Sequence, residues 1–161
     1  MRRFISSLIL IPFLFLGAGL GYAETWSMRA QIDSSNGGYV EIQGILSCDL
    51  SKCNNYDFWN CPYTINTTYI YHNFLAPFFN SLVTIDGTYY DTYVNGTYDE
   101  TGYETITGNG TIVIGDIRYT IAIDMIITDN LDYSGTIVVN GITYPIDESL
   151  GELIEDIFVS W

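Results

Sequence analysis

The sequence predicts an all-β protein, an antiparallel meander that forms an up-and-down barrel or sandwich of about 8–10 strands with a C-terminal amphipathic helix. Three observations predict this fold class. Segments in which apolar and polar residues alternate recur along the chain. Short turn sequences that contain glycine separate these segments. Over residues 149–160 the alternation gives way to the period of a helix.

The N-terminus has the three parts of a secretory signal peptide. Two arginines precede an apolar run over residues 4–16, and Gly21 and Ala23 occupy the −3 and −1 positions of a cleavage site. The run is shorter than the roughly 20 apolar residues that a membrane-spanning helix needs. We therefore expect residues 1–23 to be removed, which leaves residues 24–161 as a single β-rich domain of a secreted, periplasmic or cell-envelope protein.

The chain is strongly acidic, with 19 Asp and Glu against 5 Lys and Arg and a formal charge of −14. All of the acidic residues lie beyond the predicted signal peptide. Binding to nucleic-acid phosphates requires a basic surface, so we expect no nucleic-acid partner. We also expect no cofactor. The partners that remain are a small-molecule or glycan ligand, or another component of the cell envelope.

Three copies of one pattern predict tight β-hairpins. Each copy has strand-forming residues, a two-residue turn and a second strand that ends in tyrosine. The turns are Asp86-Gly87, Gly115-Asp116 and Asn140-Gly141, which suit type I′ or II′ geometry. The pairing places Tyr90, Tyr119 and Tyr144 opposite Val83, Ile112 and Ile137, on an apolar face that we expect to be interior.

Further strands follow from the same reasoning. Residues 25–47 form a hairpin around a turn at 34–38, and residues 63–72 and 117–127 alternate as single strands. Residues 73–81 are apolar without a clean period, so they are expected to form a buried connection or a short helical turn. Two more turn sequences are Asn95-Gly96 and Gly108-Asn109-Gly110.

The C-terminal segment carries an apolar stripe at helical spacing. The stripe consists of Leu150, Leu153, Ile154, Ile157, Phe158 and Trp161. Ser149 and Glu152 match a capping box, which would begin the helix at this point. The helix is expected to cover an open end or an outer face of the sheet.

Residues 48–62 interrupt the strand pattern with a polar loop that contains three cysteines and several aromatic residues. In an oxidising compartment, two of Cys48, Cys53 and Cys61 should form a disulfide, with all three pairings open and one thiol left over. A zinc site that adds His72, the single histidine of the chain, is the alternative.

Tyrosines and tryptophans are the best candidates for contacts with a ligand. Their rings can stack on sugars or line an apolar pocket, although tyrosine is also a favoured strand residue. The candidates are Tyr56, Trp59, Tyr69, Tyr71, Tyr90, Tyr119 and Tyr144.

Candidates for metal binding and catalysis are weak. Asp129 and Asp132 could supply oxygens to Ca²⁺, but turn formation accounts for the same residues. The sequence around His72 lacks a nucleophile motif, and the separation of any pair of carboxylates depends on the fold. We therefore expect no catalytic residue and a protein that is not an enzyme.

The meander followed by a C-terminal helix resembles the lipocalin and wider calycin architecture. The lipocalin Gly-x-Trp signature is absent, because Trp26 follows Glu24-Thr25. The resemblance concerns architecture and implies no function.

The leading hypothesis is a secreted or periplasmic, non-enzymatic β-domain that binds a small apolar, aromatic or carbohydrate ligand. One alternative is a small outer-membrane β-barrel, since the alternating residues before Trp161 resemble the closing strand of such barrels. Another is a structural or adhesive surface subunit that assembles through its strand edges.

Overall fold

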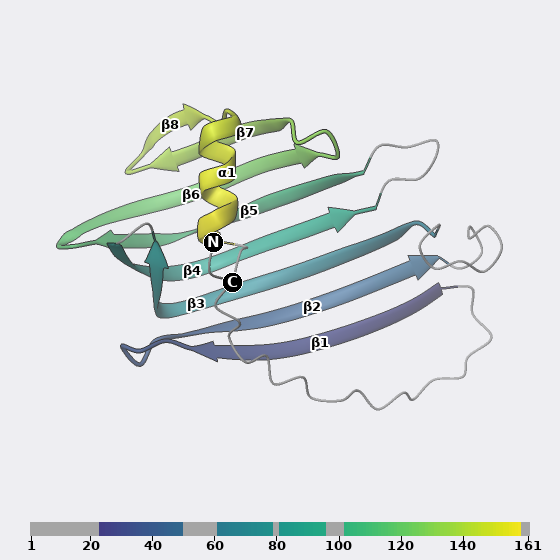
Figure 1. Cartoon of the computed structure of the whole chain (residues 1–161), viewed down its shortest axis with the longest axis horizontal. Coiled ribbons are helices and arrows are strands. Elements are labelled where there is room, and N and C mark those ends of the chain that lie inside the picture. The colour runs from purple at the N-terminus through teal and green to yellow at the C-terminus, as the bar shows by residue number, and fades with distance from the viewer. Residues whose placement is uncertain (1–22, 50–60, 79–80, 96–101, 159–161) are drawn as a thin grey trace.

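The computed structural model describes the chain except for residues 1–22, 50–60, 79–80, 96–101 and 159–161. The described strands form one antiparallel sheet in which each strand lies beside its neighbours in the sequence (Figure 1). The strands are β1 (Ala23–Asp33), β2 (Tyr39–Asp49), β3 (Tyr63–Phe78), β4 (Ser81–Val94), β5 (Tyr103–Ile114), β6 (Ile117–Thr128), β7 (Tyr133–Val139) and β8 (Ile142–Pro145). The helix α1 (Glu148–Phe158) follows. The predicted all-β meander with a C-terminal helix is confirmed.

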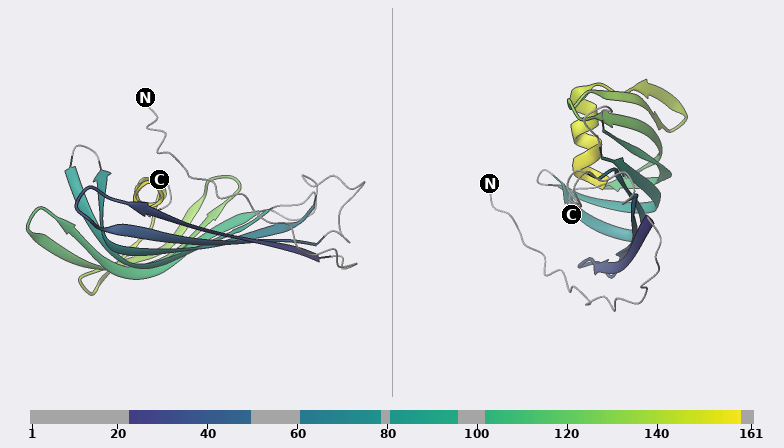
Figure 2. Two further views of the ribbon diagram at one scale, coloured as in Figure 1. Left: turned by 90° about the horizontal axis from the view of Figure 1, so that it is seen from below. Right: turned by 90° about the vertical axis from the view of Figure 1, so that its right-hand side faces the viewer.

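The sheet is strongly curved but not closed. Its strand order runs from β1 to β8, and no pairing joins these two edges in the described part of the chain. Figure 2 shows α1 end-on within the concave side of the sheet, and Figure 1 shows it crossing in front of β5, β6 and β7. The helix therefore covers the C-terminal half of the concave face. No helix among the described residues is long and apolar enough to cross a membrane.

Two of the three tyrosine hairpins are confirmed. Ile114 lies opposite Ile117 across the Gly115-Asp116 turn, and Val139 lies opposite Ile142 across the turn that follows it. At that second turn Asn140 and Gly141 have φ angles of 50° and 81°, as a type I′ turn requires. The predicted hairpin at 25–47 is also confirmed, because β1 and β2 pair throughout.

The first tyrosine hairpin was predicted wrongly, because β4 runs straight through Asp86-Gly87. Val83 pairs with Ile114 of β5 rather than with Tyr90, and the predicted turn at Gly108-Asn109-Gly110 is part of β5. Gly87 lies opposite Gly110, and a Cβ atom on Gly87 would stand 2.5 Å from the Gly110 Cα. These glycines permit a close backbone approach within the curved sheet instead of a reversal of the chain.

Residues 73–81 also differ from expectation. The segment is neither a loose connection nor a helical turn, because β3 continues to Phe78 after a shift of register between Tyr71 and Phe74. Asn73 takes a φ of 49° at this shift. The bulge returns Phe74 to the core face, where it is 5% exposed.

The helix begins one residue earlier than predicted. Its cap is Asp147, whose Oδ1 accepts a hydrogen bond from the Leu150 backbone N–H at 3.0 Å, and Ser149 lies inside the first turn. Gly151 rests on the ring of Tyr133, where a Cβ atom would come within 3 Å of the side chain. Ile154 faces the sheet and is 2% exposed.

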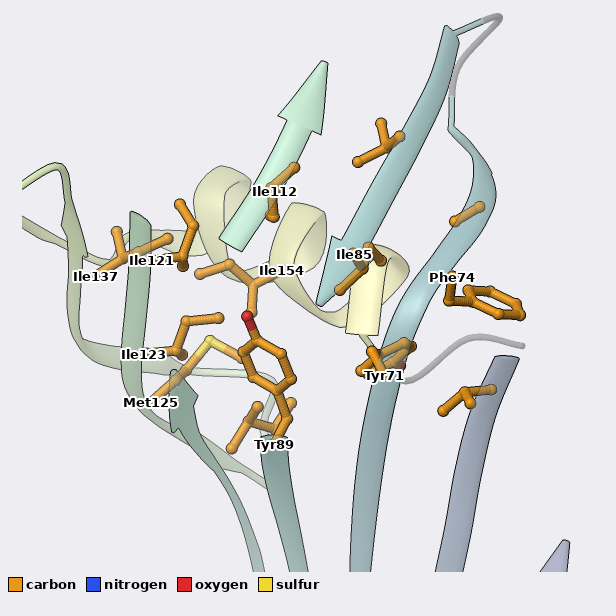
Figure 3. Packing of buried hydrophobic residues seen from close by; sticks show 14 of the residues in the cluster. Tyr71, Phe74, Ile85, Tyr89, Ile112, Ile121, Ile123, Met125, Ile137 and Ile154 are labelled. Atoms are coloured by element: carbon orange, nitrogen blue, oxygen red, sulfur yellow. The ribbon is translucent and has the colours of Figure 1, made fainter. Parts of the chain in front are cut away.

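The hydrophobic core lies between the concave face and α1. Figure 3 shows Tyr89 and Met125 directed toward Ile154 of the helix. The buried members of the core are Val40, Tyr71, Phe74, Ala76, Val83, Ile85, Tyr89, Ile106, Ile112, Ile121, Ile123, Met125, Ile127, Ile137, Ile146 and Ile154.

Candidate functional site

Two acidic side chains lie on the core face of the sheet, beside the buried residues. Asp91 of β4 is two residues beyond Tyr89, and Glu104 of β5 is two residues before Ile106. Side chains two residues apart on a strand share a face, and both Tyr89 and Ile106 are 1% exposed. The register places Asp91 opposite Ile106 and Glu104 opposite Tyr93, so the two carboxyl groups are diagonal neighbours.

The two carboxyl groups are close enough for each to affect the ionisation of the other. The Oδ1 atom of Asp91 is buried without a hydrogen-bond partner among the described residues. Burial is the main reason that the pKa of Asp91 rises to about 6 and that of Glu104 to about 7. The charge of Asp91 further raises the pKa of Glu104. Because each group affects the ionisation of the other, the pair titrates as a unit and retains a proton in mildly acidic solution.

A third carboxyl group approaches from the helix. Glu155 of α1 accepts a hydrogen bond from the Tyr133 hydroxyl of β7 at 3.0 Å. Its charge also raises the pKa of both Asp91 and Glu104. Burial and the Glu155 carboxylate raise the pKa of Tyr133 to about 12, so this hydroxyl remains a donor throughout the neutral range.

A pocket of about 180 Å³ lies next to the carboxyl groups, at the end of the sheet where β5 begins and β6 ends. Its lining combines two tyrosines, apolar side chains, a hydroxyl and three acidic residues. These residues are Tyr93, Tyr103, Glu104, Ile127, Thr128, Asp129, Leu131 and Glu155. Pockets for drug-sized ligands are about 300–1,000 Å³, so this one suits a smaller molecule.

The chemistry of the pocket is that of a binding site with hydrogen-bond acceptors. The aromatic rings and Ile127 offer apolar surface, while the carboxyl oxygens accept hydrogen bonds from hydroxyl or amine groups. Asp91 and Glu104 are diagonal neighbours on adjacent strands, and each affects the ionisation of the other. Among the described residues, no group of three or more His, Cys, Asp or Glu is arranged to hold a metal ion.

The aromatic residues predicted to contact a ligand lie in different parts of the sheet. Tyr69 and Tyr71 lie on the concave face, and their ring centroids are 6.4 Å apart. The ring centroids of Tyr71 and Tyr89 are 5.8 Å apart. Tyr119 packs against the edge of the same core. Tyr144 is also on this face but is 45% exposed in the last strand.

Tyr90 does not lie on the interior face. It is 51% exposed and points away from the buried Tyr89, because adjacent residues of a strand face opposite sides. The tyrosines of the three repeats are therefore not brought together. Tyr56 and Trp59 lie outside the described residues.

The cysteine loop is described only at its ends. Cys48 lies in β2 and Cys61 precedes β3, and both are buried, at 2% and 1% exposure. Cys53 lies outside the described residues, and the disulfide stays a prediction. His72 pairs with Tyr39 at the start of β2, roughly 30 Å along the strand from Cys48, so the alternative zinc set is not assembled.

Asp129 and Asp132 lie in the turn between β6 and β7. The Oδ2 atom of Asp129 accepts a hydrogen bond from the Gly102 backbone N–H at 2.6 Å, which ties this turn to the start of β5. The neighbouring Leu131 has a φ of 61°. Asp129 therefore lies in a turn, and binding of Ca²⁺ by Asp129 and Asp132 stays a prediction.

The carboxyl pair and the pocket were missed by sequence reasoning. Alternation places Asp91 on the same strand face as Tyr89 and Tyr93, and Glu104 on the same face as Ile106. An acidic residue at an apolar position of the pattern was therefore the signal that could have revealed the pair. Recognising it requires β4 and β5 to be continuous strands, which the glycine-containing segments obscured.

Comparison with known proteins supplies no relative. No protein-family model matches the chain, and neither a curated protein nor a solved structure matches it. The case for a function therefore depends on the chemistry of the residues described above.

Proposed function

We propose that the protein is an exported, non-enzymatic β-domain that binds a small aromatic or carbohydrate ligand in the pocket beside α1. The observation that carries the proposal is the composition of this pocket. Tyr93 and Tyr103 provide rings for stacking, and Glu104 and Glu155 provide acceptors for the hydroxyl groups of the ligand. Its volume of about 180 Å³ matches a group of the size of a substituted phenol or a single sugar ring.

The acidic character of the molecule supports a neutral ligand rather than an anionic one. Three acidic residues line the pocket, and none of its described lining residues is Lys or Arg. In the described part of the chain Arg29 and Arg118 are the only Lys or Arg residues, and both are exposed. A phosphate or carboxylate on the ligand would therefore meet like charge without a compensating partner.

The test is ligand-observed NMR at pH 5.5 with two neutral probes, 4-ethylphenol and methyl β-glucoside. Saturation transfer from the protein to at least one of these probes is the expected result. Replacing Tyr103 by Ala should reduce this transfer at least fivefold, because the substitution removes one aromatic wall of the pocket. Tyr103 is 42% exposed, so its truncation leaves the core intact.

The matched control is Tyr90→Ala. Tyr90 is a similarly exposed tyrosine on the neighbouring strand but does not line the pocket. Its removal should leave the transfer unchanged. The proposal fails if neither probe binds, or if both tyrosine variants weaken binding equally.

Export belongs to the same proposal. The signal-peptide pattern predicts cleavage after Ala23, and β1 begins at this residue. Cleavage there would leave nearly the whole first strand in the mature chain. Mass spectrometry of the chain recovered from the cell envelope or medium should give a mature protein that begins at Glu24, and an intact N-terminus would contradict export with cleavage.

A further inference from the structure

The two edges of the sheet are built differently. At one edge β8 has four residues and ends at Pro145, so it offers little backbone to another strand (Figure 1). At the other edge β1 has eleven residues, and its sequence contains no Pro, Gly or Lys. β1 pairs with β2 without a shift of register, and no described strand pairs with its outer side. Short length, proline, lysine and bulges are the usual protections of an edge strand, and β1 has none of them.

Alternate residues of β1 direct their backbone groups to this outer edge. The Ser34 N–H donates to the Gly38 carbonyl at 2.7 Å where the β1–β2 hairpin closes. Hydrogen-bonded and non-hydrogen-bonded pairs alternate along an antiparallel ladder, so the even-numbered residues of β1 bond with β2. The odd-numbered residues from Ser27 to Asp33 therefore point their N–H and C=O groups away from β2.

We propose that two copies of the chain pair through β1 in a two-fold symmetric, antiparallel dimer, with Ala30 opposite Ala30 of the second copy. This alignment pairs residues 27–33 of each copy and joins the two sheets into one. It places odd-numbered residues opposite odd-numbered residues, so the outward N–H and C=O groups find partners. The interface is far from the ligand pocket in the fold, so the inference does not depend on the proposed function.

The convex side of this alignment is complementary in charge, which favours a second copy as the partner. Arg29 and Asp33 are both exposed and lie on the same side of β1. With Ala30 at the axis, Arg29 lies opposite Gln31 of the second copy and diagonal to its Asp33, within reach of an arginine side chain. Two-fold symmetry makes this contact occur twice.

The side chain of Gln31 supports the same alignment. Its Nε2 donates to Asp33 Oδ1 at 2.7 Å, so the carboxylate lies on the side of Asp33 that Arg29 of the second copy would approach. A shift that placed residue 29 at the axis would instead set the two Arg29 side chains against each other, which is destabilising. The charges therefore select between neighbouring alignments.

The concave side of the alignment is apolar. Met28 is 47% exposed at the edge of the sheet, and Ile32 packs against the margin of the hydrophobic core. The two-fold axis at Ala30 places Met28 opposite Ile32 of the second copy. Pairing would thus remove the exposed Met28 side chain from water and continue the apolar concave face from one molecule to the other.

The test is analytical ultracentrifugation of the exported mature protein from about 10 µM to about 1 mM. The paired segment is short and the chain carries a formal charge of −14, so we expect a reversible dimer rather than a permanent one. Salt at about 0.15 M screens the repulsion between the two acidic molecules. The mass should rise with concentration from that of one chain to that of two. A monomer at every concentration would overturn self-pairing and leave the edge to a strand of another protein.

Charge exchange tests the alignment. Arg29→Asp should raise the dissociation constant at least tenfold, and addition of Asp33→Arg to the same chain should restore it to within threefold of the native value. The two positions are about 13 Å apart along one strand, so this rescue requires the second copy. Arg118→Asp is the control, because it makes the same change of charge at an exposed site on β6 and should leave the dimer intact. Failure of the rescue, or equal weakening by Arg118→Asp, would overturn the proposal.

The backbone contact has its own test at Ser27. The N–H of this residue points outward, so Ser27→Pro removes a donor to the second copy and leaves the ladder between β1 and β2 in place. It should weaken the dimer at least tenfold, whereas Ser27→Ala, which keeps the N–H, should not. A thermal unfolding midpoint close to the native one checks that the proline variant is folded. Equal dimerisation of both Ser27 variants would overturn the proposal.

Amide hydrogen exchange of the native protein gives a direct readout of the geometry. Between the lowest and the highest concentration, the N–H groups of Arg29 and Gln31 should gain protection, because they enter the ladder between the two copies. Those of Met28 and Ala30 already bond with β2 and should change far less. Equal changes at odd-numbered and even-numbered residues would contradict pairing through this edge.

Discussion

Replacing Glu104 by Gln should stabilise the fold at pH 8 and have little effect in acid. The pKa of this carboxyl group is raised from 4.5 to about 7, mainly by burial and then by the charge of Asp91. A carboxyl group with a raised pKa binds its proton more tightly in the folded state. The native protein therefore loses stability as the pH rises from about 4.5 to about 7, and this loss is complete above pH 7.

The size of the effect follows from the same shift. At about 1.4 kcal/mol for each pH unit, a fully buried group would cost roughly 3 kcal/mol on ionisation. Glu104 is half-buried, so solvent screening reduces the expected gain from Glu104→Gln to about 1 to 2 kcal/mol at pH 8. The glutamine amide can donate to Asp91, which preserves the contact between β4 and β5.

The assay is urea denaturation of the native protein and Glu104→Gln at pH 4.5 and pH 8. At pH 4.5 the free energy of unfolding of Glu104→Gln should be close to that of the native protein. At pH 8 it should be higher by the predicted amount. Asp124→Asn serves as the control, because it also removes one negative charge but from a side chain that is exposed to solvent. A destabilised Glu104→Gln protein at pH 8, or an equal change at both pH values, would refute the reasoning.

Three further predictions concern α1 and the cysteines. Gly151→Ala should lower the free energy of unfolding by about 1 kcal/mol or more despite the helix propensity of alanine, since its Cβ would collide with Tyr133; Glu152→Ala, at an exposed neighbour, should have little effect on thermal unfolding. Tyr133→Phe should cost about 1 to 2 kcal/mol in urea denaturation by removing the hydrogen bond to Glu155, and an unchanged midpoint would show that this bond contributes nothing. Alkylation of the exported protein without reduction should modify one of its three cysteines, as intact mass can verify, whereas three modified thiols would contradict the predicted disulfide.

Several elements could be predicted because the signal is local. The turn at Asn140-Gly141 is specified by two adjacent residues that tolerate positive φ, and both have it. The alternation in β6 and the apolar stripe of α1 are likewise properties of a short stretch. These patterns were sufficient for the all-β class, the meander and the C-terminal helix.

The glycines of β4 and β5 show where local reasoning fails. Asp86-Gly87 and Asn140-Gly141 have almost the same turn chemistry, yet the first continues a strand and the second reverses the chain. The difference arises from the partner strand, because Gly87 is needed for close approach to Gly110, which is more than twenty residues away. A short-range pattern does not contain this requirement.

The sequence by itself determined the acidic composition, the alternating strands and the amphipathic helix, because each depends on residues that are neighbours in the chain. Only the tertiary structure decided that Asp91, Glu104 and Glu155 meet, because strand register and helix placement bring three separate elements to one interface. Burial at that interface turns ordinary acidic residues into groups that titrate near neutrality. The pocket beside them likewise exists only once β5, β6 and α1 are in place.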